Sequence, residues 1–372
     1  MMNFIFHQPV PIHFGIDAIK DLPLIIEKFN SSRGLLVCTP SLVKNGTAKQ
    51  IIQQSNGKLI NVFSAIQPNP TVYNTNNLVE KIHELQCDFI VAVGGGSILD
   101  CAKMARIVAV HDGDCTDYIH NRKTFSKKGL PIITIPTTSG SASEVSSVSV
   151  LTDEVANKKV AIAHPYLFSD YAIIDPRLTV SCPPTVTAIS GIDVIAHALE
   201  AFYNVHHQPF PDHFAKHAVK LAFDNLELAV KHPHNLEARS KMAEASVAAG
   251  VAFSQTGTAA AHACSYPLTQ IFGVPHGEAC AITLSAFWRL NATADPRLDE
   301  MSKELGFTDA HALAARIDEI KQSIGLRMKL ADVGVKTEED LQLLVKESFA
   351  PNMANNPVQM TEESLRKFYE SL

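Results

Sequence analysis

The sequence predicts an N-terminal α/β domain built on a parallel sheet, followed by an all-α C-terminal domain, and two observations support this fold class. In the first half of the chain, short apolar runs alternate with segments of helix length. Buried strands separated by helices are typical of a parallel sheet that is covered on both faces. From Pro184 onward, nearly every segment has the periodicity of a helix. We therefore expect a boundary near residues 178–184 and two domains, 1–180 and 181–372.

Each expected element follows from its local pattern. Runs of β-branched and other apolar residues predict strands at residues 34–38, 59–63, 89–93 and 130–135. Amphipathic segments between them predict helices at residues 41–54, 72–85 and 98–110. In the second half, residues 235–252 and 309–324 are examples of the long helices that we expect there.

Composition excludes several classes of function. The formal net charge is −6, and Lys and Arg are scattered, so we expect neither a nucleic-acid nor a membrane-surface partner. No apolar stretch approaches the roughly 20 residues of a membrane span, and the first residues do not resemble a signal peptide. The seven cysteines contain no C-x-x-C pair, which favours a reducing compartment. We expect a cytoplasmic protein that acts on a small molecule.

A glycine turn is the first candidate ligand site. Gly94, Gly95, Gly96 and Ser97 directly follow an expected strand and open an expected helix that contains Asp100. Glycines let the backbone approach a pyrophosphate, and the N–H groups at a helix N-terminus favour negative charge. A tight turn without any ligand explains the same residues equally well, and the turn does not match the dinucleotide G-x-G-x-x-G pattern.

A second polar loop follows the next expected strand. Thr137, Thr138 and Ser141 lie in a hydroxyl-rich segment, residues 136–144, at the carboxyl end of that strand. Ligands of α/β proteins bind at this edge of the sheet. A solvated Ser/Thr loop is the alternative interpretation.

One carboxylate and three imidazoles form a candidate metal site. Asp193 and His197 are four residues apart in a helical pattern and therefore share one helix face. His262 and His276 follow much later in the chain. Such N and O donors suit Fe²⁺ or Zn²⁺ with a position left open for substrate. Spacing alone leaves open that each histidine is an ordinary core or surface residue.

Taken together, these segments resemble the iron-containing (group III) alcohol dehydrogenase family, which has the dehydroquinate-synthase-like fold with a Rossmann-like nucleotide domain. The resemblance covers nearly the whole chain, from Phe14 to Pro357. The segments that carry it are residues 68–71, 94–103 and 136–144, together with Asp193, His197, His262 and His276.

The resemblance implies an oxidoreductase that transfers a hydride between NAD(P)(H) and a small primary alcohol or aldehyde. It implies that Asp193, His197, His262 and His276 bind the metal, Fe²⁺ with Zn²⁺ as the alternative. It also implies that the following residues contact the cofactor: Thr39, Asn69, Gly94, Gly95, Gly96, Ser97, Asp100, Thr137, Thr138, Ser141, Ser146 and Lys159. A homodimer is the expected assembly.

Three departures from the commonest family pattern bear on the chemistry. Tyr266 stands where many members have a second histidine after the third ligand, so we expect its hydroxyl to relay a proton. Thr39 replaces an Asp found in many NAD-dependent members, and without that carboxylate NADPH is expected to be tolerated or preferred. Residues 253–269 are more similar to phosphonoacetaldehyde reductases than to simple alkanol dehydrogenases, which points to a short anionic aldehyde.

Two other functions remain open from the sequence. One is a lyase or synthase of the same fold that uses NAD and restores it within one turnover. The other is a non-catalytic metal-binding protein, although a scaffold has no need for both a glycine turn and a ligand set. Net oxidation or reduction of the nicotinamide distinguishes the dehydrogenase from both.

Overall fold

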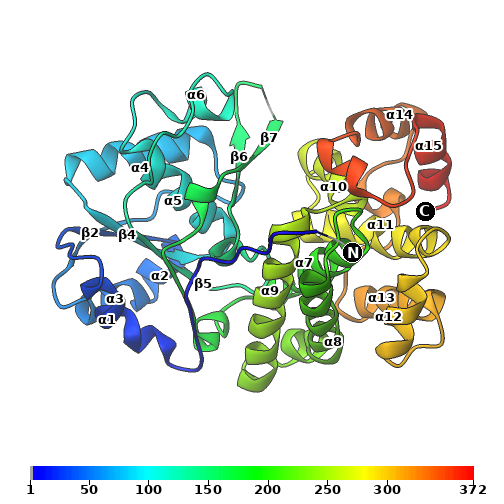
Figure 1. Ribbon diagram of the computed structural model, residues 1–372, viewed down its shortest axis with the longest axis horizontal. Helices are drawn as coiled ribbons and strands as arrows, with labels where there is room; N and C mark the ends of the chain where they lie inside the picture. Colours follow the sequence, from blue (N-terminus) through cyan, green and yellow to red (C-terminus); the bar gives the residue numbers. More distant parts are fainter. Residues whose placement is uncertain (1–2, 157) are drawn as a thin grey trace. The chain divides into compact units, whose positions relative to one another are not determined.

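The computed structural model describes residues 3–156 and 158–372. The described chain divides into two compact units (Figure 1). The α/β unit comprises Gln8–Thr138 and Ala142–Thr179. The helical unit comprises Val180–Leu372, Ser139–Ser141 and the N-terminal segment up to His7.

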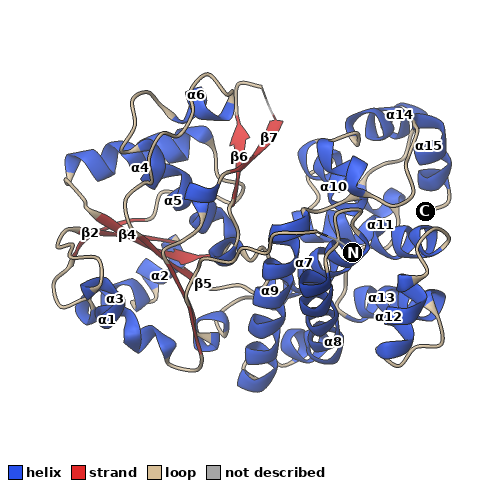
Figure 2. Ribbon diagram, viewed as in Figure 1, coloured by secondary structure: helices blue, strands red, loops and turns tan. Residues whose placement is uncertain are grey.

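A parallel sheet forms the centre of the α/β unit (Figure 2). Among the described residues it has six strands in the order β1-β8-β5-β4-β2-β3, and every neighbouring pair is parallel. Its strands are β1 (Ile12–Phe14), β2 (Gly34–Cys38), β3 (Leu59–Phe63), β4 (Phe89–Gly94), β5 (Ile132–Pro136) and β8 (Tyr171–Ile174). The four strands expected from apolar runs are present, while the short strands β1 and β8 were not identified from the sequence.

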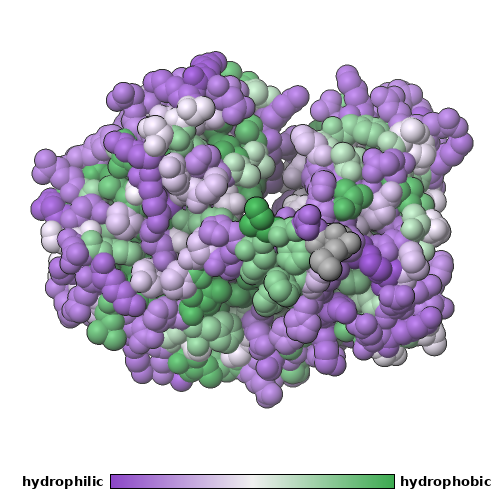
Figure 3. Space-filling model, in the orientation of Figure 1, coloured by the Kyte–Doolittle hydropathy of each residue, from purple (hydrophilic) through white to green (hydrophobic). Residues whose placement is uncertain are grey.

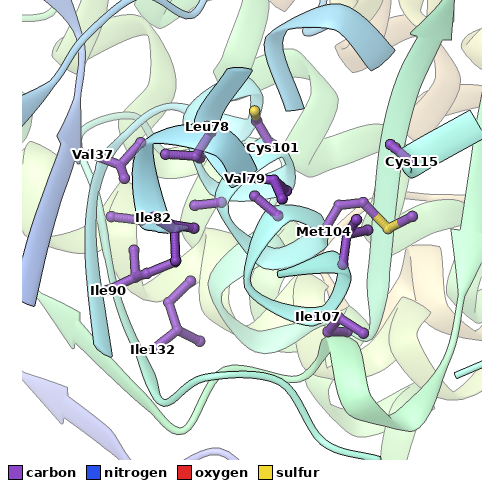
Figure 4. Close-up of a cluster of buried hydrophobic side chains, with 14 of the residues drawn as sticks. Val37, Leu78, Val79, Ile82, Ile90, Cys101, Met104, Ile107, Cys115 and Ile132 are labelled. Atoms are coloured by element: carbon purple, nitrogen blue, oxygen red, sulfur yellow. The ribbon is translucent and has the colours of Figure 1, made fainter. Parts of the chain in front are cut away.

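Helices cover both faces of this sheet, because successive side chains of a buried strand point to opposite faces. Leu35 and Val37 of β2 pack among residues of α4 and α5, whereas Leu36 and Cys38 pack among residues of α1 and α3. Figure 1 shows these pairs of helices on opposite sides of the sheet, and Figure 4 shows the cluster beneath α4 and α5. The helices of the unit are α1 (Leu22–Glu27), α2 (Pro40–Lys44), α3 (Thr47–Gln54), α4 (Val72–Glu84), α5 (Gly96–Val108) and α6 (Cys115–Ile119).

The single helix expected over residues 41–54 is wrong, because the structure has two helices there. Asn45 and Gly46 separate α2 from α3. Gly46 has a φ of 84°, which lies in the left-handed region and cannot continue a right-handed helix. The amphipathic pattern continues across this break, which explains why periodicity alone does not reveal it.

An antiparallel hairpin, β6 (Val148–Asp153) and β7 (Lys158–Ala163), forms a separate small sheet in the α/β unit. It was not identified from the sequence. Its position is fixed by Thr152, whose N–H donates to the Pro70 carbonyl and which also forms a β-bridge with Thr71. The hairpin therefore lies beside the turn that contains Asn69.

Helices make up the helical unit, as its sequence pattern predicts. They are α7 (Pro184–Tyr203), α8 (Pro209–Lys231), α9 (Leu236–Thr256), α10 (Ala260–Gln270), α11 (His276–Ala292), α12 (Arg297–Glu304), α13 (Ala310–Ser323), α14 (Glu338–Glu347) and α15 (Glu362–Glu370). Short 3-10 helices complete the described chain: η1 (Ala18–Asp21), η2 (Ser143–Val145), η3 (Pro165–Leu167), η4 (Pro176–Thr179), η5 (Leu330–Val333) and η6 (Pro351–Asn355).

Helix α7 is the central helix of this unit and packs against α8, α9 and α11. Among the described helices it alone is long and apolar enough to cross a membrane, but 78% of that stretch is buried inside the protein. Burial of this kind is expected of a core helix. On the face shown in Figure 3, hydrophilic residues are interspersed with hydrophobic ones, as on the surface of an ordinary globular domain.

Candidate metal centre and cofactor loops

Three of the segments that carry expected cofactor residues lie at one edge of the parallel sheet. The strand register places Cys38, Val93 and Ile135 side by side at the carboxyl ends of β2, β4 and β5. Thr39 and the glycine turn follow the first two of these strands directly. The Thr137 N–H donates to the Gly94 carbonyl at 3.0 Å, which joins the polar loop to the turn.

The absence of a side chain has a different explanation at Gly94 than at Gly95. A Cβ on Gly94 would lie 2.5 Å from the Ile98 side chain, so Gly94 is required by packing. A Cβ on Gly95 would meet only Thr138, at 3.4 and 3.6 Å, and its φ of −77° suits any residue. Neither the backbone nor the packing of the protein therefore explains Gly95. Its bare backbone at the N-terminus of α5 suits a phosphate group.

Asn69 and Ser97 lie together at the start of α5. The Asn69 N–H donates to the Ser97 hydroxyl at 3.3 Å, and the backbone of Asn69 has a φ of 55°. Lys159 lies on β7 in register with Thr152, which is bound to the same turn. Asn69, Ser97 and the strand that carries Lys159 are thus brought into one region of the α/β unit.

Asp100 is used inside the protein. Its carboxylate accepts hydrogen bonds from the Ser143 hydroxyl at 2.5 Å and from the Val150 N–H at 3.0 Å. One turn further along α5, the Lys103 ammonium donates to the carbonyls of Ser143, Ser146 and Val148. Burial raises the pKa of Asp100 and lowers that of Lys103 to about 8. Asp100 and Lys103 therefore bind the segment that contains Ser146 to α5, the helix that follows the glycine turn. The side chain of Ser146 is buried.

The candidate metal ligands come from three helices of the helical unit. Potential ligand atoms of Asp193 on α7, His262 on α10, and His276 and Cys280 on α11 all lie within 4.8 Å of one another. Cys280 was not identified from the sequence, although its position one helical turn after His276 was a usable signal. Gly277 allows this close approach, because a Cβ there would lie 2.0 Å from the Ile189 carbonyl oxygen of α7.

His197 lies beside this group. Its Nδ1 is 3.8 Å from Asp193 Oδ2, and its ring centroid is 4.5 Å from that of His262. The ring stacks on Phe253 at 4.3 Å and also hydrogen-bonds the backbone of Gly140. The four ligands expected from the sequence are therefore neighbours, with Cys280 inside the tightest group and His197 next to it.

Buried polar atoms without partners support a metal ion in this position. Asp193 Oδ1, His197 Nδ1 and His262 Nε2 are buried and have no hydrogen-bond partner. Asp193 and His262 are only 5% and 3% exposed. Each such unsatisfied group costs about 1–3 kcal/mol, and a bound cation would satisfy them together. The donor set therefore fits a divalent transition metal.

The charge states of two of these residues, Asp193 and His197, also suit metal binding. Burial by itself would raise the pKa of Asp193, but the neighbouring histidines lower it overall, so that the carboxylate is ionised. Burial lowers the pKa of His197 to about 4, so that its imidazole is neutral near pH 7. Ionised carboxylates and neutral imidazoles are the forms that bind metals.

Glu200, fully buried on α7, fixes the orientation of His262. Its carboxylate accepts from His262 Nδ1 at 2.5 Å, from the backbone N–H groups of Ala259 and His262, and from the Tyr203 hydroxyl. Since Nδ1 donates to this carboxylate, the lone pair of Nε2 is directed to the candidate metal centre. The sequence places Glu200 on the helix face of Asp193, but it does not reveal this contact.

Tyr266 lies beside His276. Its ring is stacked parallel to that of His276, with centroids 6.4 Å apart. Burial raises the pKa of Tyr266, so the hydroxyl keeps its proton at neutral pH. The structure therefore places a phenol next to the candidate centre, as expected from its spacing to His262.

We predict that Glu200→Gln lowers the affinity for the metal about 10- to 100-fold, because it removes the carboxylate that orients His262. Equilibrium competition with a chelator, followed by metal analysis, measures the change. Glu244→Gln is the control, because Glu244 pairs with His217 and Lys241 on the exposed side of the same unit. An unchanged affinity in Glu200→Gln would show that His262 is held in place without this hydrogen bond.

Known proteins resemble the chain over its whole length. The family model for iron-containing alcohol dehydrogenase matches residues 9–176, and the model for the C-terminal part of the Fe-containing alcohol dehydrogenase family matches residues 187–372. Long-chain-alcohol dehydrogenase 1 from Geobacillus thermodenitrificans is 34% identical over 96% of this chain and 94% of its own length.

Solved structures agree in fold. The sulfoacetaldehyde reductase from Bifidobacterium kashiwanohense, solved in complex with NAD⁺, is 43% identical, with a TM-score of 0.97 and coverage of 100% of this chain and 99% of that one. A 1,3-propanediol oxidoreductase is 30% identical, with a TM-score of 0.94 and full coverage of both chains. These matches confirm the predicted fold class and the oxidoreductase activity, and they leave no ground for a lyase or a non-catalytic metal-binding protein.

Because models of one family match both halves of the chain, and a relative above 30% identity spans nearly all of it, this protein belongs to the iron-containing alcohol dehydrogenase family and is an NAD-dependent oxidoreductase of alcohols and aldehydes.

Proposed function

We propose that this enzyme reduces a short anionic aldehyde of the sulfoacetaldehyde or phosphonoacetaldehyde type. The observation that carries the proposal is the 43% identity, over the whole chain, with a sulfoacetaldehyde reductase. Relatives whose names refer to uncharged alcohols, such as 1,3-propanediol dehydrogenase from Klebsiella pneumoniae, are 32% identical. The chain is thus more similar to an enzyme for a sulfonated aldehyde than to these.

The position of the divergent segment supports the same substrate class. Residues 253–269, the segment that resembles phosphonoacetaldehyde reductases, supply Phe253, His262 and Tyr266. Phe253 stacks on His197, and Tyr266 stacks on His276. This segment therefore contributes to the surroundings of the candidate metal centre, a position that suits it to influence the choice of substrate.

We assign the metal to Asp193, His197, His262 and His276, and the unpartnered buried atoms among them support this assignment. Bound there, Fe²⁺ or Zn²⁺ supplies a Lewis acid that polarises the carbonyl oxygen of the substrate. Glu200 holds His262 in the orientation that binding needs. The ring of Tyr266 is stacked parallel to that of His276, and its hydroxyl keeps its proton at neutral pH, so we assign Tyr266 to the delivery of a proton to the alcohol product.

We assign the nicotinamide cofactor to the carboxyl edge of the sheet. Gly95, Gly96 and Ser97 suit the pyrophosphate, because they form the N-terminus of α5. The remaining contacts are assigned to Thr39, Asn69, Gly94, Thr137, Thr138, Ser141, Ser146 and Lys159. Asp100 is assigned a structural role instead, because its carboxylate is bound to Ser143 and Val150.

These assignments make residues 1–180 the nucleotide-binding domain and residues 181–372 the metal-binding domain. We further propose a homodimer in the cytoplasm. All seven cysteines are buried and unpaired, which agrees with a reducing compartment.

We predict that the metal-loaded enzyme reduces sulfoacetaldehyde or phosphonoacetaldehyde with a kcat/KM at least about tenfold above that for propanal, a difference of about 1.4 kcal/mol in transition-state binding. Consumption of NADH, followed by absorbance, measures the rates. The His276→Ala variant is the control, because it removes a proposed metal ligand and is expected to lose both the metal and the activity. Equal or faster reduction of propanal would contradict the anionic substrate class.

We predict that Gly95→Val lowers the affinity for NAD⁺ at least about tenfold while the metal content and the unfolding temperature stay near those of the wild type. The added side chain fills the space that we assign to the pyrophosphate, and its Cβ fits against Thr138 without a clash. Calorimetric titration with NAD⁺ gives the affinity, and Gly95→Ala is expected to have a smaller effect. Wild-type affinity in Gly95→Val would exclude this turn as the phosphate site.

We predict that NADPH is used at least as well as NADH and that Thr39→Asp shifts the preference toward NADH. Thr39 is the N-cap of α2, a position at which Asp is also favourable, so the helix should be kept. A carboxylate there would repel a 2′-phosphate, at a cost of roughly a kcal/mol or more. The KM values for both cofactors measure the shift, and Thr39→Asn is the uncharged control. An unchanged cofactor ratio in Thr39→Asp would place the selection elsewhere.

A further inference from the structure

Asparagine side chains hold the short segment that leads into α10, residues 257–259. The Nδ2 groups of Asn204, Asn355 and Asn352 donate to the backbone carbonyls of residues 257, 258 and 259, at 3.2, 2.8 and 3.1 Å respectively. Three consecutive carbonyls are thus bound by side chains from other parts of the helical unit. The backbone on both sides of Thr258 is therefore fixed, and with it the place to which the Thr258 side chain is directed.

The hydroxyl of Thr258 connects Asn352 with Tyr266. Asn352 Nδ2 donates to Thr258 Oγ1 at 3.1 Å, and Thr258 also hydrogen-bonds Tyr266. The same Nδ2 is bound to the Ala259 carbonyl, which can only accept, so the orientation of the Asn352 amide is fixed. Because Thr258 Oγ1 accepts from Asn352, its own proton is available to the phenol oxygen of Tyr266. A phenol that accepts this hydrogen bond directs its own proton away from Thr258.

Tyr266 needs such a partner because a hydroxyl group can rotate about its C–O bond. The Tyr266 ring is stacked parallel to that of His276, but stacking does not fix the direction of the hydroxyl proton. A hydrogen bond from Thr258 fixes that direction. It also stabilises the phenolate that remains when the proton leaves, because the tyrosine is only partly exposed to water.

We propose that Thr258 is a positioning residue that orients the Tyr266 hydroxyl for proton delivery, an inference that rests on the role proposed for Tyr266 above. In the reducing direction, the carbonyl carbon of the aldehyde receives a hydride from NADH. The carbonyl oxygen receives the proton of Tyr266 as the phenolic O–H bond breaks. The phenolate accepts from Thr258, which in turn accepts from Asn352, and it regains a proton from solvent. Aldehyde, NADH and one solvent proton thus become alcohol and NAD⁺.

Single-turnover reduction of sulfoacetaldehyde and of propanal by the metal-loaded, full-length enzyme tests the proposal, with NADH absorbance as the signal. We expect Thr258→Val to lower the maximal rate about tenfold, the effect of one hydrogen bond lost in the transition state. The aldehyde concentration at half-maximal rate should stay near that of the wild type, while the ratio of rates in H₂O and D₂O should rise. Thr258→Ser keeps a hydroxyl and should recover most of the rate. Thr293→Val is the control, because it removes an exposed hydroxyl that donates to the Leu290 carbonyl.

The double variant Thr258→Val/Tyr266→Phe separates a role that acts through Tyr266 from any other role of Thr258. Tyr266→Phe alone should lower the maximal rate about 100-fold or more, since it removes the proton donor. In that background Thr258→Val should cause no further fall, because no phenol is left to orient. A further fall of the size seen in the single Thr258→Val variant would overturn the proposal.

The possible failures can be told apart. An unchanged rate in Tyr266→Phe would overturn the role of Tyr266 and, with it, that of Thr258. A slow Tyr266→Phe together with a wild-type rate in Thr258→Val would overturn the role of Thr258 alone. A Thr258→Val variant that only needs more aldehyde would assign Thr258 to substrate binding and also overturn the proposal.

Each variant is compared with the wild type on both aldehydes, so failure of the anionic substrate class does not affect the test. Metal content and the unfolding temperature show whether a variant is intact. Thr258→Ala takes the place of Thr258→Val if the branched apolar side chain disturbs the segment.

Discussion

The candidate metal centre depends on the buried carboxylate of Glu200, which connects α7 with α10. From α7 it accepts hydrogen bonds from the ring and the backbone of His262 and from the backbone of Ala259, at the start of α10. A buried charge is stable only when it is paired and hydrogen-bonded, so this contact restricts how α10 begins. Asp193 lies on the same face of α7. The position of α10 therefore brings His262 next to Asp193, and the lone pair of His262 Nε2 is directed to the same point.

Helix α11 reaches the candidate metal centre for a steric reason. Helix α11 begins at His276 and approaches α7 so closely that Gly277 has no room for a side chain beside the Ile189 carbonyl. The absence of a Cβ thus allows His276 and Cys280 to approach Asp193. Burial lowers the pKa of His197 and leaves donor atoms of Asp193, His197 and His262 without hydrogen-bond partners, a condition that favours a bound metal ion.

The loops at the candidate cofactor edge of the sheet are stabilised by a different interaction, a buried ion pair with its hydrogen bonds. Asp100 and Lys103, one turn apart on α5, bind the segment from Ser143 to Val150 through its hydroxyl, N–H and carbonyl groups. An ion pair that is buried without such partners would be costly, whereas here each charge has hydrogen bonds in addition to its counter-charge. The helix that begins with the glycine turn is therefore hydrogen-bonded to the segment from Ser143 to Val150.

The sequence by itself determined the fold class and the alternation of buried strands with helices, because periodicity is a local property of the chain. The family followed from the resemblance of its motifs to those of known members. It did not reveal the break at Gly46, the strands β1 and β8, or the β6–β7 hairpin, because the amphipathic pattern crosses that break and short strands carry too few residues for a period to show. The tertiary structure alone decided which side chains meet. Glu200 looks like an ordinary helix residue in the sequence, and Asp100 looks like a cofactor residue, because the contacts of both are made with partners on other elements. Contacts of this kind depend on how helices pack, and no single segment of the sequence encodes that packing.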